Sequence, residues 1–465
     1  MVVALTAADV AAATGGRLAT GDTQTPIGRI SIDSRVLASG DFFVAILGER
    51  FDGHTFVAEA LRRGSVGVLV SDPASVPSAS EAVVVHVEDT TRALQDLARW
   101  IRRKSGSKVV AITGSAGKTT TKEICAELLS TRYRVFRNKG NLNNHIGLPL
   151  SLLDLREVPD VAVVELGMNH PGEIRTLVGI AEPEIRVWTN VGDAHIGFFK
   201  SGDAIADAKA EVIESARPDD VLVVNANDER VMSRIAPFKG RVVTFGTEVD
   251  ATVTGRNVNV RGLEGTTATV STPAGEFELH SPLLGLGNLS NVLAATAVAV
   301  TMSVPPAAIA ERISSLRPSQ HRGELLRLPG GVTLVDDSYN SSPAALTRAL
   351  ETIATAHGSA RKVAVLGQML ELGEHGRRLH EECGRAAAQA GLDVLIVVGG
   401  DDARELAASA VSNGMASGTV LHVASNKEAV EASLQRIRPG DLVLVKGSRG
   451  IGLDLVVERL RAEFA

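Results

Sequence analysis

The sequence predicts an α/β protein of three domains, and three observations lead to that prediction. Strand-like and helix-like stretches alternate from Val109 onward, and the alternation begins again after a polar break at residues 316–320. A glycine-rich loop at residues 114–117 stands between a strand pattern and a helix pattern, as in sheets that bind phosphates. The 465 residues suffice for three domains of ordinary size. We therefore place a small α/β domain at residues 1–104, a parallel-sheet domain at 105–317 and a doubly wound, Rossmann-like domain at 318–465.

The first domain mixes short strands with helices. One helix is expected over residues 57–63, and a second contains Ala93, Leu94, Leu97 and Ile101, whose spacing places them on one apolar face. The polar residues 102–108 that follow are predicted to be a linker to the second domain.

The second domain is predicted to hold a parallel sheet with crossover helices. Helices are expected to begin near Lys118, Glu173 and Ala204, between β-branched, apolar stretches. Residues 251–280 have the pattern of short strands and turns, and an apolar helix follows from Leu289. The predicted strands cover residues 109–113, 161–166, 186–191 and 221–224.

The third domain repeats the alternation of strands and helices and ends with a helix over residues 453–463. This pattern predicts a second doubly wound unit, with helices between the strands. The predicted strands cover residues 332–335, 362–366, 394–398 and 442–445.

Composition excludes several classes of protein. A net charge of −6 with 3% aromatic residues argues against a nucleic-acid surface. The two cysteines, Cys125 and Cys383, lack the number and spacing of a disulfide framework or a zinc site. The first residues do not form a signal peptide, and the most apolar helix candidate, residues 289–302, is too short to cross a bilayer. We expect a cytoplasmic protein that does not enter the membrane and works as a monomer.

The loop Gly114-Ser115-Ala116-Gly117-Lys118-Thr119-Thr120 is the strongest chemical signal. Two glycines allow backbone N–H groups to surround a phosphate, and the helix that follows adds its N-terminus. Lys118 can reach the terminal phosphates and the Thr119 hydroxyl can bind Mg²⁺. A full Walker A sequence has a glycine where this chain has Ile112, so an ordinary turn is the alternative. The position between strand and helix favours a nucleoside triphosphate.

Polar residues that follow the other strands are candidates for the same site, because ligands bind beyond the carboxyl ends of parallel strands. Glu165 could hold Mg²⁺ or cap a helix, and His195 could be a ligand or structural. Lys209 shares a predicted helix face with Ile205 and Ile213. A bare ammonium on an apolar face is costly, so this lysine either extends to solvent or is modified.

Further candidates lie in loops of the second and third domains. Asn144 belongs to an asparagine-rich loop that suits either a turn or a phosphate contact. The runs 336–340 and 446–449 each follow a predicted strand of the third domain. Arg322, at the junction of the two domains, could reach a transferring phosphoryl group.

Together these residues resemble the Mur ligase family, and the resemblance covers nearly the whole chain. It rests on residues 113–123, 165–174 and 336–343, and on 33–35 and 48–54, which resemble the part that holds the UDP end of the substrate. The first three runs are most similar to the family members that add D-alanyl-D-alanine. Members that add the third peptide residue, folate-extending ligases and a nucleotide-binding protein without ligase activity are the alternatives.

The resemblance implies an ATP-dependent ligation. UDP-N-acetylmuramoyl-tripeptide, ATP and D-alanyl-D-alanine would give the UDP-pentapeptide, ADP and phosphate through an acyl phosphate, in the synthesis of peptidoglycan precursors. It also implies two Mg²⁺ ions. The residues that would contact ATP are Gly114, Ser115, Ala116, Gly117, Lys118, Thr119, Thr120, Asn291, Arg322 and Asp337.

The same resemblance assigns the remaining roles residue by residue. Mg²⁺ would be held by Thr119, Glu165, His195 and Lys209, the last as a carbamate. The residues that would take part in the chemistry are Lys118, Lys209, His195, Arg322 and Asn144. The two other substrates would contact Ser34, Arg35, Gly48, Arg50, Asp52, His54, Tyr339 and Asn340.

The chain departs from the family pattern at two places. The family often has His-Asn where this chain has Gly287-Asn288, and Asn-Ala-Asn-Pro where it has the run 340–343. These differences bear on the contacts to adenine and to the dipeptide, and they leave the phosphate and metal residues unchanged.

Overall fold

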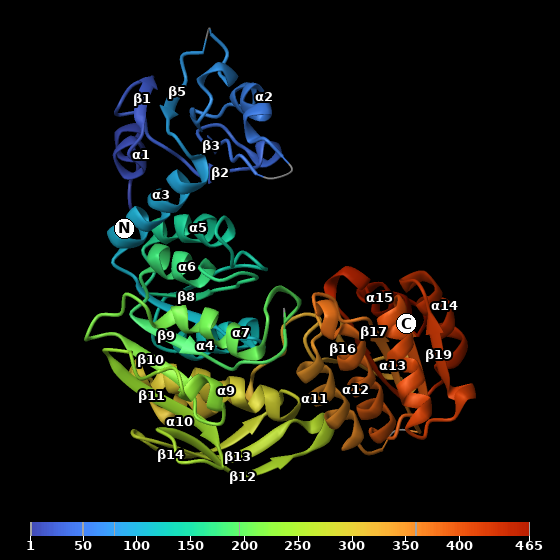
Figure 1. Cartoon of the computed structure of the whole chain (residues 1–465). Helices are drawn as coiled ribbons and strands as arrows, with labels where there is room; N and C mark the ends of the chain where they lie inside the picture. The colour runs from blue at the N-terminus through green and yellow to red at the C-terminus, as the bar shows by residue number, and fades with distance from the viewer. Residues whose placement is uncertain (1, 49–50, 79, 195, 359, 465) are drawn as a thin grey trace. The chain divides into compact units, whose positions relative to one another are not determined.

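The computed structural model describes residues 2–48, 51–78, 80–194, 196–358 and 360–464 (Figure 1). Its contacts divide the chain into two compact units. Unit 1 comprises Met1–Ala111 and Tyr133–Arg186, and unit 2 comprises Ile112–Arg132 and Val187–Ala465. The chain passes from one unit to the other three times: within strand β6 (Lys108–Thr113), between Arg132 and Tyr133, and within strand β9 (Ile185–Trp188).

Unit 1 begins with a five-stranded sheet in the order β1-β5-β4-β3-β2. The sheet is parallel except for β1, which pairs with β5 in the antiparallel direction. Its core gathers apolar residues such as Phe43, Val57 and Val68, because both faces of the middle strands are buried. The strands are β1 (Arg17–Thr20), β2 (Ile30–Ser31), β3 (Phe42–Val44), β4 (Gly67–Val70) and β5 (Val83–His86). The helices are α1 (Ala7–Thr14), α2 (Val57–Arg62) and α3 (Thr90–Ser105).

The predicted linker at residues 102–108 is wrong, because α3 continues through Ser105. Arg102 is 6% exposed and donates from Nε to the carbonyl of Ala181 at 2.8 Å and from Nη2 to the carbonyl of Glu182 at 2.8 Å. It also forms an ion pair with Glu184. The sequence alone does not distinguish this run of charged residues from a solvated linker. The hydrogen-bond acceptors of Arg102 lie about eighty positions away, and only the fold brings them close.

The rest of unit 1 carries the polar residues that follow β8. Strand β8 (Val161–Glu165) is buried along its whole length and pairs in parallel with β7 (Val135–Arg137). Two helices accompany it, α5 (Gly147–Leu152) and α6 (Glu173–Ala181). The start of α6 at Glu173 agrees with the sequence-based prediction.

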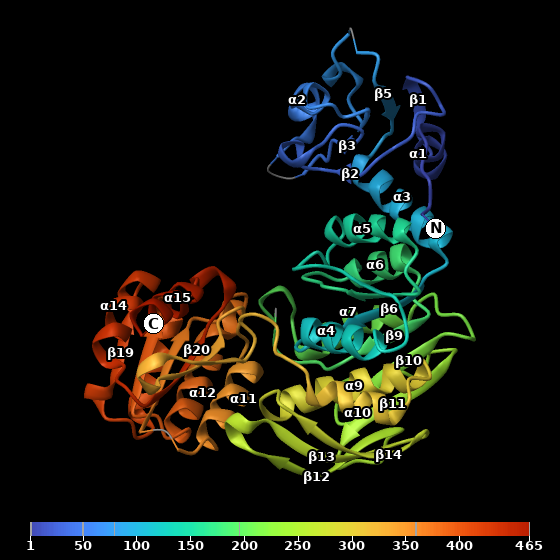
Figure 2. The same cartoon turned by 180° about the vertical axis from the view of Figure 1, so that it is seen from behind.

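The first part of unit 2 contains a sheet portion in the order β14-β13-β12-β11-β10-β9 (Figure 2). Strands β10, β11 and β12 are parallel, whereas β12, β13 and β14 form an antiparallel meander, which confirms the short strands expected at 251–280. The strands are β10 (Val221–Asn225), β11 (Arg241–Thr247), β12 (Val253–Val260), β13 (Thr266–Thr272) and β14 (Gly275–Ser281). The helices are α4 (Lys118–Leu129), α7 (Gly202–Ala210), α8 (Glu229–Met232), α9 (Gly285–Thr301) and α10 (Pro306–Ser314).

Helix α9 is the centre of this part of unit 2. It packs against α4 and against β10 to β13, and residues 292–299 are buried on every side. That all-round burial explains why its sequence has the apolar character noted above without spanning a bilayer. None of the helices in the described part of the chain combines the length and apolar character that a membrane crossing requires.

The second part of unit 2 is a six-stranded sheet in the order β15-β16-β20-β17-β18-β19. It is parallel except for the edge strand β15, and helices flank it as the doubly wound prediction requires. The strands are β15 (Glu324–Arg327), β16 (Thr333–Asp337), β17 (Arg361–Gly367), β18 (Val394–Val398), β19 (Val420–Val423) and β20 (Asp441–Lys446). The helices are α11 (Pro343–Ala354), α12 (Gly376–Gln389), α13 (Asp401–Ser412), α14 (Asn426–Arg436) and α15 (Asp454–Glu463).

Candidate functional site

The glycine-rich loop joins β6 to α4, and both of its glycines are required by close contacts. A Cβ atom at Gly114 would lie 1.9 Å from Thr189 Oγ1. At Gly117, where φ is +80°, a Cβ would lie 2.2 Å from Asn291 Oδ1. Larger residues would therefore displace the loop from its supports, and the left-handed conformation of Gly117 adds a second penalty.

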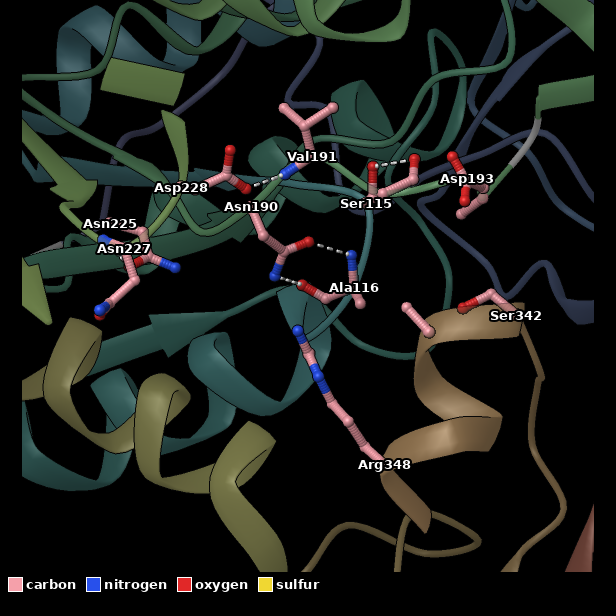
Figure 3. Close-up of a pocket in the computed structure, with 13 residues that line it drawn as sticks. Ser115, Ala116, Asn190, Val191, Asp193, Asn225, Asn227, Asp228, Ser342 and Arg348 are labelled. Carbon is pink, nitrogen blue, oxygen red and sulfur yellow. Dashed lines mark hydrogen bonds between the residues drawn. The ribbon is translucent and has the colours of Figure 1, made fainter. Parts of the chain in front are cut away.

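Asn190, which Figure 3 shows bonded to Ala116, and Thr189 hold the loop in shape. Asn190 accepts at Oδ1 from the N–H of Ala116 (2.9 Å) and donates from Nδ2 to the carbonyl of Ala116 (3.0 Å). Its own carbonyl accepts from the N–H of Ser115 at 3.0 Å, and Thr189 Oγ1 donates to the carbonyl of Ala116 at 2.9 Å. Asn190 was missed as a site residue because the predicted strand, 186–191, included it, whereas β9 ends at Trp188 and leaves Asn190 in the segment after the strand.

Helix α4 begins at Lys118, directly after the loop. Its N-cap is Gly117, which makes no side-chain capping bond, so the helix N-terminus keeps the electrostatic field that favours an anion. Lys118 Nζ donates to the carbonyl of Gly114 at 3.0 Å, which folds the ammonium group over the loop. Thr119 and Thr120 occupy the first turn of the same helix. The arrangement provides N–H dipoles, an ammonium and hydroxyls in one place.

Asn291 lies on α9 and bonds to α4, the helix that follows the loop. The side chain is 7% exposed, accepts from Thr121 Oγ1 at 3.2 Å and donates to Asn288 Oδ1 at 3.3 Å. It therefore stabilises the packing of α9 on α4.

A cavity of about 160 Å³ lies beside the loop and is lined by residues from four segments. The loop contributes Ser115 and Ala116, the segments after β9 and β10 contribute Asn190 and Asp228, and α11 contributes Arg348 (Figure 3). Asp228 Oδ2 accepts from the N–H of Val191 at 2.7 Å, which fixes the segment after β9. The cavity wall is thus polar and internally bonded.

Glu165 and Asn144 lie in unit 1 at the end of β8 and the start of α5. Glu165 is 3% exposed, and its Oε1 accepts from Asn143 Nδ2 at 2.8 Å. Asn144 Oδ1 accepts from the N–H of Gly147 at 2.8 Å and of Ile146 at 3.2 Å. Asn144 is exposed, and its side chain bonds to the backbone just at the start of α5, which begins at Gly147.

Lys209 is buried, with 2% exposure, near the end of α7. The helix ends at Ala210 and a 3₁₀ turn, Glu211–Ile213, follows, so the continuous helical face predicted from Ile205 to Ile213 is wrong. Burial of the side chain nevertheless agrees with the apolar position seen in the sequence. His195 and Arg50 lie outside the described residues. Within the described ranges, no three His, Cys, Asp or Glu side chains gather as a ready metal-binding group.

The third-domain residues meet at the carboxyl ends of β16 and β20. Asp337 accepts from Lys446 Nζ at 2.6 Å, and the same ammonium donates to the carbonyl of Asn340 at 3.0 Å. The guanidinium carbon of Arg322 lies 4.1 Å from the centroid of the Tyr339 ring. The structure therefore brings Arg322, Asp337, Tyr339 and Asn340 into one cluster.

The candidate residues of the N-terminal domain are bonded to one another. Arg35 makes a two-pronged ion pair with Asp33, at 2.9 and 2.8 Å, and its side chain is 81% exposed. These bonds from Arg35 lower the pKa of Asp33 to about 2.

The second motif of that domain is built around His54. His54 is 7% exposed, and its Nε2 accepts from the N–H of Ser71 at 3.0 Å. Its Nδ1 therefore carries the proton and donates to Asp52 at 2.6 Å. Ser34 is also buried, and Gly48 donates its N–H to the carbonyl of Phe51 in a turn.

Three family models match successive parts of the chain. The "Mur ligase family, catalytic domain" matches residues 26–102, the "Mur ligase middle domain" 112–299 and the "Mur ligase, glutamate ligase domain" 321–449.

Full-length relatives agree with these models. The chain is 34% identical to UDP-N-acetylmuramoyl-tripeptide--D-alanyl-D-alanine ligase of Bacillus subtilis (strain 168), over 94% of both chains. It is also 34% identical to the enzyme of that name from Escherichia coli (strain K12), over 93% of both chains. Among solved structures, MurF from Acinetobacter baumannii aligns over 99% of both chains with a TM-score of 0.90 and 30% identity. MurF from Thermotoga maritima in complex with ADP aligns over 94% of this chain and 97% of its own, with a TM-score of 0.82 and 30% identity.

Proposed function

This chain belongs to the Mur ligase family, and from that premise we propose that it joins D-alanyl-D-alanine to UDP-N-acetylmuramoyl-tripeptide with ATP. The observation that carries the proposal is the braced loop from Gly114 to Lys118 at the start of α4, in a chain that aligns end to end with ligases of that name. The reaction belongs to peptidoglycan precursor synthesis, and we propose that the protein acts in the cytoplasm as a monomer.

The chemistry has two steps. The terminal carboxylate of the tripeptide attacks the γ-phosphorus of ATP, the bond to the ADP oxygen breaks, and an acyl phosphate forms. The amine of the dipeptide then attacks the acyl carbon, a tetrahedral intermediate collapses, the bond to the phosphate oxygen breaks and the amine loses a proton. Both nucleophile and γ-phosphate begin as anions, so cationic groups must reduce their repulsion.

The residues of unit 2 fit the nucleotide part of this reaction. The N–H groups of the loop and the ammonium of Lys118 would hold the β- and γ-phosphates, since they meet at the N-terminus of α4. Asn291 would contact adenine, Asp337 the ribose, and Arg322 the γ-phosphate. For Asn144, which belongs to unit 1, the family resemblance likewise suggests a contact to the γ-phosphate.

Mg²⁺ suits Thr119 and Glu165, because a hydroxyl, a carboxylate and water are the oxygen ligands it prefers. Thr119 and Glu165 would hold one ion and His195 would contribute to a second. Bound Mg²⁺ would neutralise charge on the phosphates. The burial of Glu165 beside Asn143 fits an oriented ligand, since the amide fixes one carboxylate oxygen.

We also propose that Lys209 is carbamylated. Lys209 is 2% exposed, and addition of CO₂ to its neutral amine, with loss of a proton, gives a carbamate anion that can bind metal. Lys209→Ala should lose activity, and a short carboxylic acid added at high concentration should restore part of it. Lack of rescue by any such acid, in a correctly folded variant, would leave the carbamate without support.

Phosphate release from ATP and Mg²⁺ with UDP-N-acetylmuramoyl-tripeptide tests the function directly. We expect turnover with D-alanyl-D-alanine and none with single amino acids. Turnover with a single amino acid would identify a sister ligase instead. No turnover with any acceptor would favour a nucleotide-binding protein without ligase activity.

A further inference from the structure

The run Lys446-Gly447-Ser448-Arg449 follows β20, and the proposed reaction leaves its polar residues without a role. Lys446 is 3% exposed and its ammonium binds Asp337 and the carbonyl of Asn340, so it holds two loops together. Ser448 is 4% exposed, and its hydroxyl accepts from the N–H of Leu370 at 3.0 Å. Arg449 alone in this run is exposed, and it is therefore the residue able to meet a ligand.

Arg449 lies against the same aromatic ring as Arg322. Its guanidinium carbon is 4.9 Å from the centroid of Tyr339, and that of Arg322 is 4.1 Å from it. Across the residues that the structure describes, neither guanidinium has a carboxylate partner within ion-pair distance. Two like charges on one ring repel each other, and an anion bound beside them would remove that repulsion. The cluster therefore has the character of an oxyanion site.

The backbone around this ring is firmly held. The N–H of Tyr339 donates to the carbonyl of His321 at 3.1 Å, and His321 Nδ1 lies 2.7 Å from the buried Asp336 Oδ2. On the other side, Arg449 opens a 3₁₀ turn, Arg449–Ile451, whose preceding residue Ser448 is anchored to Leu370. The ring and both guanidinium groups thus project from fixed loops, which lowers the entropy lost on binding.

We propose that Arg449, oriented by the Tyr339 ring, binds the terminal carboxylate of the acceptor dipeptide. This inference rests on the proposed function. A ligase that accepts a dipeptide and refuses single amino acids must recognise the carboxylate at a set distance from the amine. The planar guanidinium group is suited to this, because it can donate two parallel hydrogen bonds to one carboxylate. With Lys446 bonded to Asp337 and Arg322 assigned to the γ-phosphate, Arg449 is the cation of this cluster that remains for the acceptor.

Kinetics of Arg449→Ala and Arg449→Lys test the assignment. Arg449→Ala should raise KM for D-alanyl-D-alanine about 10–100-fold and change KM for ATP less than about twofold, since one charge-assisted pair is lost. Arg449→Lys should have a KM for D-alanyl-D-alanine between those of the wild type and Arg449→Ala. Lysine keeps the positive charge but cannot donate the two parallel hydrogen bonds of a guanidinium group. The wild type should prefer D-alanyl-D-alanine to D-alanyl-D-alaninamide, which lacks the carboxylate, and Arg449→Ala should lose most of that preference.

Arg459→Ala is the matched control, because Arg459 is an exposed arginine on α15 of the same sheet domain. It should leave every parameter unchanged. If Arg449→Ala keeps its preference for the free carboxylate, or lowers kcat with KM for the dipeptide unchanged, the guanidinium serves the phosphoryl group or nothing and the inference is wrong. Failure of the proposed function is distinguishable, since the wild type itself would then show no dipeptide-dependent phosphate release.

Discussion

The phosphate loop of unit 2 and the two motifs of the N-terminal domain are both short polar runs next to strands, but they are stabilised in opposite ways. The loop is held from outside, by Asn190 and Thr189, and its own lysine folds over it. The N-terminal motifs are held from inside: Arg35 binds Asp33, and His54 binds Asp52. The first arrangement shapes a backbone cradle, whereas the second uses side chains to stabilise turns.

This difference separates residues that meet a ligand from residues that position others. A side chain whose donors and acceptors are all satisfied by neighbouring protein groups has little left for a substrate. His54, buried and bonded at both ring nitrogens, is in that position, while the guanidinium of Arg35 is mostly exposed despite its ion pair. The comparison predicts that substitutions in the two regions will change different quantities.

The largest effect is expected for Lys118→Ala. Loss of the ammonium over the loop should lower kcat about 10²–10³-fold or more, because it removes a cation from the developing charge on the phosphates. The thermal midpoint should change less than the activity does, because Lys118 is only half-buried and donates to the carbonyl of Gly114 within the loop itself. Phosphate release and a melting curve check both parts. Full activity in the variant would contradict the role of the loop.

Asn190→Ala should have the next largest effect and tests the bracing itself. It removes two hydrogen bonds that fix Ala116, and we expect KM for ATP to rise about tenfold with a smaller change in kcat. Asn413→Ala is the matched control, because Asn413 also makes two side-chain bonds, both to Ser409, at the end of α13. Equal ATP affinity in the two variants would show that the loop keeps its shape without Asn190.

Much of this architecture follows from the sequence, because buried parallel strands are continuous apolar runs. Strand β18 and the starts of α4 and α6 fall where the pattern predicts them. Strands β15 and β19 were missed, since they lie at the edges of their sheet, where burial is partial and the apolar pattern is weak. The predicted strand at 186–191 ends at Trp188, because residues 189 and 190 turn to support the phosphate loop.

The candidate site was predictable where one local motif carries it and less so where partners are distant. Gly114 to Lys118 could be recognised from residue type and order alone. The dependence of Ala116 on Asn190, more than seventy positions away, requires the fold. The pairing of Arg449 with Tyr339 likewise appears only when the ends of β16 and β20 are brought together.

Arg35→Ala should have a smaller effect than Lys118→Ala or Asn190→Ala. The quantity that it should change is the KM for one substrate. We expect KM for UDP-N-acetylmuramoyl-tripeptide to rise a few-fold, because an exposed guanidinium is lost, with only a small drop in the thermal midpoint at neutral pH, because an exposed ion pair contributes little to stability. Arg35 lowers the pKa of Asp33 to about 2, so Asp33 stays ionised at working pH. The pair's contribution to stability is present above a pH of about 4 and is lost as pH falls toward about 2. An unchanged KM would make this pair purely structural.

The smallest effect on activity is expected for His54→Ala, which should instead affect folding. The variant leaves the N–H groups of Ser71 and Asp72 without their imidazole acceptor, at a cost of about 1–3 kcal/mol in the free energy of unfolding, while Asp52 Oδ1 keeps the backbone N–H of residue 54. KM for the UDP substrate should stay within about twofold of the wild type. Denaturant unfolding and steady-state kinetics measure the two quantities.

His86→Ala is the control for that variant, because His86 ends β5 of the same sheet, is half-buried and makes no side-chain hydrogen bond in the described part of the chain. It should cost less stability than His54→Ala and leave KM unchanged. A rise in KM for the UDP substrate in His54→Ala at full stability would place this imidazole in contact with substrate. Hydrogen bonds to neighbouring protein groups would then no longer distinguish residues that position others from residues that bind substrate. The contrast between the phosphate loop and the N-terminal motifs would then not hold for His54.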